Sequence, residues 1–200
     1  MVLLVGHSLG SVACWIEAGT YHDVDGVIIT GLLHHLNSTS LAGVVATLYP
    51  ATLDPRFANQ LLNVNYAGYL TTEPGTREDD FYYEPGTDPN VLQTDEATKE
   101  TATPGEFSSF AEPIADGISL QINVPVLVVV GQDDSLFCGL AATDCSSAAT
   151  IQQAEAPFYA PQARLQVAVV PEAGHNINLH KTAPLWFATA KAWTSQHFAP

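Results

Sequence analysis

The feature that most constrains the fold is the pentapeptide Gly6-His7-Ser8-Leu9-Gly10, which directly follows the apolar run Met1 to Val5. A short continuous apolar run predicts a parallel strand that is buried on both faces. Glycine two residues before and two residues after Ser8 predicts a sharp turn that holds the serine exposed at the end of that strand. Residues Leu9 to Glu17 contain few helix breakers, so we expect a helix whose amino end lies beside the serine.

Two later stretches place further polar side chains after predicted strands. Val126 to Val130 is a second buried-strand run, and Asp133 and Asp134 follow it. Leu165 to Val170 predicts another strand, and His175 follows that one. Because the carboxyl ends of parallel strands meet at one edge of a sheet, we expect these side chains to lie near the serine.

The three kinds of side chain are chemically complementary. A serine hydroxyl becomes a good nucleophile when a histidine accepts its proton, and a carboxylate must fix the tautomer of that histidine. Residues Asp25 to Thr30 predict a further parallel strand, but no carboxylate follows it in the next loop. We therefore expect the acid at one member of the pair Asp133-Asp134.

In this order of serine, aspartate and histidine, the sequence resembles the α/β-hydrolase superfamily, in particular its esterases, lipases and peptidases with a serine nucleophile. Gly6 to Gly10 matches the nucleophile elbow of that family, Asp134 matches its acid and His175 matches its histidine. The resemblance implies an α/β fold with a mostly parallel sheet flanked by helices. It also implies a catalytic triad of Ser8, Asp134 and His175. The backbone N–H of Leu9 would contribute to the oxyanion hole.

The chain departs from the family at its beginning. A family member has several strands and helices before the elbow, and five residues cannot contain them. We therefore expect residues 1–200 to hold the C-terminal half of such a fold. Met1 would then be an internal methionine or a mistaken start, and a second oxyanion-hole donor would lie upstream of it.

The chain is expected to divide into three parts. Residues 1–36 form one part of the core, with the elbow strand, its helix and the next strand. Residues 123–200 form the rest of the core, with the acid strand, the histidine loop and a C-terminal helix. Residues 37–122 are far too many for a connection between two core strands, so they predict an inserted cap or lid that covers the site.

Two local features are expected inside this insertion. Asp54 to Leu70 places apolar residues close to helical spacing, and Asp54-Pro55 is typical of a helix start. Asp95 and Lys99 have the spacing of an ion pair on one helix face.

Composition excludes some partners. The six Lys and Arg residues against 21 Asp and Glu give a net charge of −15, which opposes binding to nucleic acid. No run approaches the roughly 18 apolar residues of a membrane span, so no transmembrane segment is expected. The expected partner is a small-molecule acyl substrate. No cofactor and no metal are implied, and the sequence leaves the oligomeric state open.

The three cysteines give a hint about the compartment. Cys138 and Cys145 lie in the loop after the Asp134 strand, where they could form a disulfide under oxidising conditions, as in a secreted protein. Two free thiols are the alternative, and the sequence itself assigns no compartment. Cys14, on the helix after the elbow, is expected to be a small buried apolar residue.

The expected reaction is a two-step acyl transfer on an ester or related carbonyl. Ser8 would attack, His175 would act first as general base and then as general acid, and Asp134 would orient His175. Water would release the acyl group. Other readings stay open: a peptidase, an acyltransferase or a cofactor-free haloperoxidase of the same fold, or a truncated and inactive chain.

Overall fold

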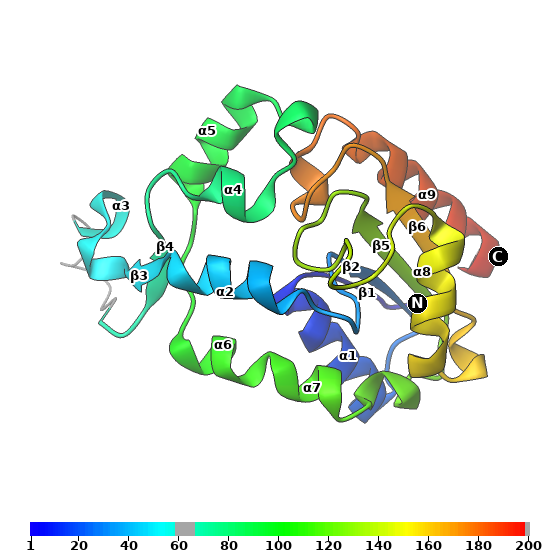
Figure 1. Cartoon of the computed structure of the whole chain (residues 1–200). Coiled ribbons are helices and arrows are strands. Elements are labelled where there is room, and N and C mark those ends of the chain that lie inside the picture. The colour runs from blue at the N-terminus through cyan, green and yellow to red at the C-terminus, as the bar shows by residue number, and fades with distance from the viewer. Residues whose placement is uncertain (59–66, 199–200) are drawn as a thin grey trace.

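The computed structural model describes residues 1–58 and 67–198 (Figure 1). Its strands are β1 (Leu3–His7), β2 (Gly26–Thr30), β3 (Leu48–Pro50), β4 (Leu70–Thr72), β5 (Val126–Gly131) and β6 (Gln166–Val170). Its α-helices are α1 (Leu9–Tyr21), α2 (Ser38–Ala46), α3 (Pro55–Ala58), α4 (Arg77–Phe81), α5 (Pro89–Thr98), α6 (Pro104–Ser109), α7 (Ala111–Ala115), α8 (Ala148–Glu155) and α9 (Ala183–Phe198).

The centre of the molecule is a parallel sheet with the strand order β1-β2-β5-β6. The four strands predicted from the sequence are these four, each within one or two residues of its expected bounds. Strands β2 and β5 are buried along their whole length, as continuous apolar runs in parallel sheets usually are. Because all four strands run the same way, the loops after them meet at one edge of the sheet.

Helices cover both faces of the sheet (Figure 1). Val27 and Ile29 of β2 pack toward one face, in a cluster that includes Trp15 of α1 and Ile151 of α8. Ile28 packs on the opposite face with residues of α9. This alternation confirms the predicted sheet flanked by helices. Among the residues that the structure describes, no helix is long and apolar enough to cross a lipid bilayer.

The long connection between β2 and β5 contains α2 to α7 and the short antiparallel pair β3–β4. In Figure 1, α2 to α5 and the β3–β4 pair lie beyond the loop edge of the main sheet, and α6 leads back to α7, which lies beside α1. A buried lysine links them: the Lys99 Nζ atom lies 2.9 Å from Asp54, 2.6 Å from Glu96 and 2.8 Å from the Thr72 carbonyl oxygen. A lysine buried with two carboxylates is paired rather than left as an isolated charge.

Two expectations for this connection need correction. A helix does begin at Pro55, but residues 59–66 of the predicted helix lie outside the described residues, and Leu70 begins strand β4 instead. Threonines follow Leu70 in β4, and β-branched residues favour a strand there. The predicted ion pair between Asp95 and Lys99 is wrong, because α5 ends at Thr98 and the Lys99 side chain turns to other carboxylates.

Cys138 and Cys145 form a disulfide, with their Cα atoms 5.5 Å apart. It closes a short loop directly after the turn that carries Asp134. Cys14 is a buried free thiol of α1, as expected.

Replacing Cys138 and Cys145 together by serine should lower the free energy of unfolding by about 2–3 kcal/mol, because the unfolded chain regains the entropy that the closed loop removes. Urea unfolding of the oxidised protein and the double variant measures this difference. Reductant should lower the midpoint of the wild type and leave that of the double variant unchanged. Equal midpoints for the two oxidised proteins would contradict the expectation.

Candidate active site

Ser8 lies in a strained turn between β1 and α1. Its φ of 52° and ψ of −119° belong to a region that residues with a side chain rarely adopt. The Ser8 N–H donates to the Thr30 carbonyl at 2.9 Å, which fixes the turn on the neighbouring strand. A Cβ at Gly6 would lie 2.4 Å from the Gly10 carbonyl oxygen, so the turn requires glycine there. At Gly10, by contrast, a Cβ would meet no described atom within 4 Å, so the expected need for glycine holds only at position 6.

Leu9 is the first residue of α1, and its N–H has no acceptor within the helix. The positive end of the helix dipole lies at the same place. Ser8 and Leu9 both line the same cavity. A backbone donor therefore stands beside the serine, where negative charge on a substrate oxygen can be stabilised.

The structure brings His175 to Asp134 and not to Asp133. The Nδ1 atom of His175 lies 2.9 Å from Oδ2 of Asp134, and both side chains are buried. The other oxygen of Asp134 accepts a hydrogen bond from the Leu136 N–H at 3.0 Å. Asp133 is exposed. Because a carboxylate only accepts, Nδ1 of His175 donates to Asp134, and Nε2 is the atom left to accept a proton.

His7, the residue before Ser8, packs directly on His175, with ring centroids 4.9 Å apart. Its Nδ1 atom lies 3.0 Å from the Thr30 hydroxyl, which itself donates to the Gly6 carbonyl, so the histidine is the donor. Burial lowers the pKa of His7 to about 4, and the nearby charge of His175 adds to the shift. His7 is therefore neutral near pH 7. His7 lies inside the motif Gly6 to Gly10, but the sequence analysis assigned it no role.

Ser8 follows β1 and His175 follows β6, so both lie on loops at the same edge of the sheet, where the His7 ring contacts His175. In the part of the chain that the structure describes, no hydrogen bond joins the Ser8 hydroxyl to the His175 ring. Catalytic hydrogen bonds of free enzymes are often long and shorten only when substrate binds. A Cβ at Gly31 would lie 2.6 Å from Cε1 of His7 and 3.2 Å from Cε1 of His175, so only glycine fits between these rings.

The lowered pKa of His7 predicts a contribution to the pH dependence of stability. An unfolded histidine titrates near pH 6.5, so between about pH 6.5 and pH 4 the unfolded chain takes up a proton at His7 and the native chain does not. This contribution to stability is full above pH 6.5 and is lost as the pH falls through that window. His7→Asn keeps a nitrogen donor near Thr30 but does not titrate.

Urea unfolding at pH 7 and at pH 4.5 should therefore show a smaller loss of stability for His7→Asn than for the wild type. His22→Asn, at the exposed end of α1, is the matched control and should follow the wild type. Identical losses for wild type and His7→Asn would refute the assignment to His7.

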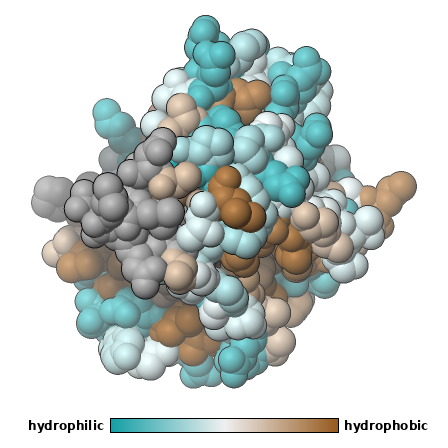
Figure 2. All heavy atoms as spheres, turned by 90° about the vertical axis from the view of Figure 1, so that its left-hand side faces the viewer, coloured by the Kyte–Doolittle hydropathy of each residue, from teal (hydrophilic) through white to brown (hydrophobic). Residues whose placement is uncertain are grey.

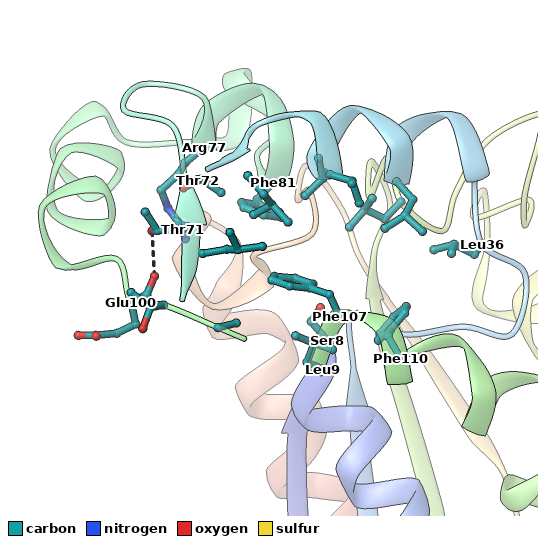
Figure 3. A pocket seen from close by; sticks show the side chains of 18 of the residues that line it. Ser8, Leu9, Leu36, Thr71, Thr72, Arg77, Phe81, Glu100, Phe107 and Phe110 are labelled. Carbon is teal, nitrogen blue, oxygen red and sulfur yellow. Dashed lines mark hydrogen bonds between the residues drawn. The ribbon is translucent and has the colours of Figure 1, made fainter. Parts of the chain in front are cut away.

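A mostly apolar cavity of about 350 Å³ adjoins Ser8 (Figure 3). Most of its wall comes from the connection between β2 and β5. Ser8 and Leu9 lie at the start of α1, Leu36 and Phe110 lie toward one end, and Thr71 and Glu100 lie toward the other. Figure 2, which views the molecule from the β3–β4 side, shows apolar surface in the middle of this face between polar regions. The volume lies at the lower end of the range for small-molecule sites.

Two aromatic rings flank His175 and were not identified from the sequence as site residues. Phe81 lies 5.8 Å and Phe137 lies 6.0 Å from the His175 ring, centroid to centroid. Both also line the cavity. Apolar rings at this position keep water away from the buried pair of His175 and Asp134, which strengthens their electrostatic interaction.

Another buried histidine, His34, does not belong to this site. Its Nδ1 atom lies 2.7 Å from Glu155 and its Nε2 atom lies 2.9 Å from the Ser119 hydroxyl, all in the core. Its ring stacks between Trp15 and Phe158. Within residues 1–58 and 67–198, no three His, Cys, Asp or Glu side chains stand together as a metal site would require. His34 therefore serves packing and a buried hydrogen-bond network.

Known structures share this arrangement of strands and helices. A soluble variant of monoglyceride lipase from Saccharomyces cerevisiae, in complex with a substrate analog, is 16% identical with a TM-score of 0.62 over 98% of this chain and 62% of its own. A monoacylglycerol lipase from Paleococcus ferrophilus is also 16% identical, with a TM-score of 0.62, over 98% of this chain and 68% of its own. A thermophilic esterase from Thermogutta terrifontis is 19% identical, with a TM-score of 0.57, over 98% of this chain and 65% of its own.

These likenesses show the fold, and the chain spans roughly two thirds of the length of each structure. No protein with a curated description matches the chain in sequence. The sequence model described as "Alpha/beta hydrolase family" matches residues 2–190. Because this match spans nearly the whole sequence, the chain belongs to the alpha/beta hydrolase family.

Proposed function

We propose that this hydrolase cleaves an ester through an acyl-enzyme formed on Ser8. The observation that carries the proposal is the buried hydrogen bond from His175 to Asp134, at the same edge of the sheet as a serine held in a strained turn at the start of α1. A carboxylate behind the histidine fixes the tautomer in which Nε2 can accept the serine proton. Family membership and the lipase and esterase folds support the same class of reaction.

In the proposed reaction, Oγ of Ser8 forms a bond to the carbonyl carbon of the ester while Nε2 of His175 takes the hydroxyl proton. The Leu9 N–H stabilises the negative charge on the carbonyl oxygen. When the C–O bond to the alcohol breaks, His175 returns the proton to the leaving oxygen. Water then attacks the acyl-enzyme in the same way and releases the acid and free Ser8.

The cavity favours an apolar acyl group as substrate. Leu41, Val44, Phe107 and Phe110 lie in its wall, and Ser8 lies at its base. An apolar chain placed there leaves water, which lowers the free energy of binding in proportion to the buried area. We therefore propose a carboxylic ester with an apolar acyl chain as the substrate class.

Residues 37–122 act, in this proposal, as a cap over the site. They supply most of the cavity wall, including residues of α2, α4 and α6. Residues 1–36 and 123–200 supply the sheet and the three reacting side chains. The cap would thus set which acyl groups fit, and the core would carry the chemistry.

Covalent labelling with a fluorophosphonate tests the proposal, because this probe reacts with an activated serine and its site can be mapped by mass spectrometry. Label is expected on Ser8. Short and medium p-nitrophenyl esters should be hydrolysed faster than an aminoacyl p-nitroanilide. Absence of label from Ser8 would overturn the proposal, and faster cleavage of the anilide would reassign it to a peptidase.

A further inference from the structure

The loop that carries His175 touches the proposed cap through its backbone. Residues 171–182, which join β6 to α9 and are called the histidine loop below, pack against residues 81–87. A Cβ at Gly174 would lie 2.7 Å from the backbone nitrogen of Tyr83, and a Cβ at Gly86 would overlap the Glu172 carbonyl oxygen. The Lys181 N–H also donates to the Gly86 carbonyl at 2.9 Å. Two glycines thus let the two backbones meet without a side chain between them.

His180 sits in this contact and is 4% exposed. Its Nε2 atom accepts hydrogen bonds from the Tyr83 N–H at 3.0 Å and from the Gly174 N–H at 3.1 Å. Its Nδ1 atom lies 3.0 Å from the Asn176 carbonyl oxygen, which can only accept. The ring therefore carries its proton on Nδ1 and is neutral.

The two N–H groups held by His180 belong to the two sides of the site. Gly174 directly precedes His175, whose ring is bound to Asp134. On the other side, Tyr83 follows Phe81, which lines the cavity and whose carbonyl accepts from the Asn176 N–H at 3.1 Å. One buried imidazole thus links the backbone that aims His175 to the backbone that carries part of the cavity wall.

We propose that His180 is a positioning residue: its neutral ring ties the histidine loop to residues 81–87, and protonation of the ring releases the tie. The inference rests on the proposed function, because it assigns His175 as the group that is positioned. Among the described residues, His180 does not line the cavity, and its hydrogen bonds go to backbone atoms of Tyr83, Gly174 and Asn176. It acts only through the backbone on both sides of it.

The neighbours of His180 decide which form is stable. Burial lowers the pKa of His180, while the Asn176 carbonyl and the carboxylates of Asp133 and Asp134 act in the opposite direction without cancelling the shift. The Tyr82 ring lies 5.4 Å away, centroid to centroid, and the Lys181 side chain turns toward the Pro85 carbonyl. A proton on Nε2 would point at the N–H groups of Tyr83 and Gly174, which would then have no acceptor on the ring. The tie is therefore present at neutral pH and is lost as the pH falls below the usual titration range of histidine.

Two substitutions separate positioning from general packing. His180→Gln places an amide oxygen near the position of Nε2 and does not titrate, whereas His180→Phe fills the space without an acceptor. At pH 8, His180→Phe should lower kcat for a p-nitrophenyl ester about 10²-fold, with a smaller change in KM, because His175 is misplaced. His180→Gln should restore most of kcat. On the acid side of the pH profile, kcat of His180→Gln should fall less steeply than kcat of the wild type, because one proton-binding group is gone.

Hydrogen exchange of the Gly174 and Tyr83 amides measures the tie without any activity. Exchange should be slow in the wild type at pH 8 and in His180→Gln, and fast in His180→Phe and in the wild type at acid pH, after correction for intrinsic rates. His197→Gln, at the far end of α9, is the control and should leave kcat, the pH profile and both amides unchanged.

Wild-type kcat and slow amide exchange in His180→Phe would overturn the inference, and so would a wild-type acid limb in His180→Gln. If His180→Phe does not fold, the inference is tested by His180→Gln alone, through the acid side of its kcat profile and through its amide exchange. A wild type that fluorophosphonate does not label at Ser8 would refute the proposed function instead. The amide exchange would still show whether His180 forms the tie.

Discussion

Ser8→Ala should lower kcat for ester hydrolysis about 10⁶-fold, because the hydroxyl that forms the acyl-enzyme is missing. Alanine removes only the hydroxyl, and its Cβ carries the same strain at a φ of 52° as the serine does. The turn is held by the Ser8 N–H and the glycine at position 6, which the substitution leaves in place. The loss should therefore appear in kcat and fluorophosphonate labelling, with an unfolding midpoint close to that of the wild type.

Ser108→Ala is the matched control for this change. Ser108 is an exposed serine of α6, next in sequence to Phe107 of the cavity wall, and its hydroxyl only donates to the Gly105 carbonyl. Its kcat and labelling should equal those of the wild type. Residual labelling of Ser8→Ala at more than a trace level would place the nucleophile at another residue.

The sheet and the candidate site could be predicted because their signals are local. The apolar run before Gly6 and the valine run before Asp134 each identify a strand, and the polar residues just after them must lie at one edge of a parallel sheet. Asp134 could be preferred to Asp133 because the family resemblance matches Asp134 to the acid. What separates them physically is visible only in the fold, where one side chain is buried against His175 and the other is exposed.

The contacts that the sequence did not reveal join residues far apart in the chain. His34 pairs with Glu155 across 121 positions, and His180 accepts from Tyr83 across 97 positions. Neither pair has a periodic pattern or a fixed spacing from which the contact could be predicted. The predicted pair of Lys99 with Asp95 failed even at short range. Helix α5 ends one residue before Lys99, and the Lys99 ammonium group pairs with Asp54 instead. Local propensity predicts elements, and tertiary packing chooses the partners of their polar groups.

Asp134→Asn should lower kcat about 10⁴-fold while leaving the fold and the Ser8 hydroxyl intact. The reason follows from the two hydrogen bonds of the carboxylate. The Leu136 N–H occupies one oxygen and Nδ1 of His175 occupies the other, so an asparagine can serve only one of these donors with its single oxygen. The Leu136 N–H is fixed in the backbone turn, which leaves the asparagine NH₂ group facing His175.

An NH₂ group beside Nδ1 selects the opposite tautomer of His175, with the proton on Nε2, where it can no longer accept the proton of Ser8. Steady-state hydrolysis of a p-nitrophenyl ester measures the loss, and the His175 ring proton seen by NMR should move from Nδ1 to Nε2. Asp133→Asn is the matched control, because Asp133 is the adjacent, exposed carboxylate of the same turn, and it should keep kcat within about twofold of the wild type. Equal losses in both variants would mean that the turn responds to charge in general. A loss confined to Asp134→Asn is the expected result, because only that carboxylate holds the tautomer that the serine needs.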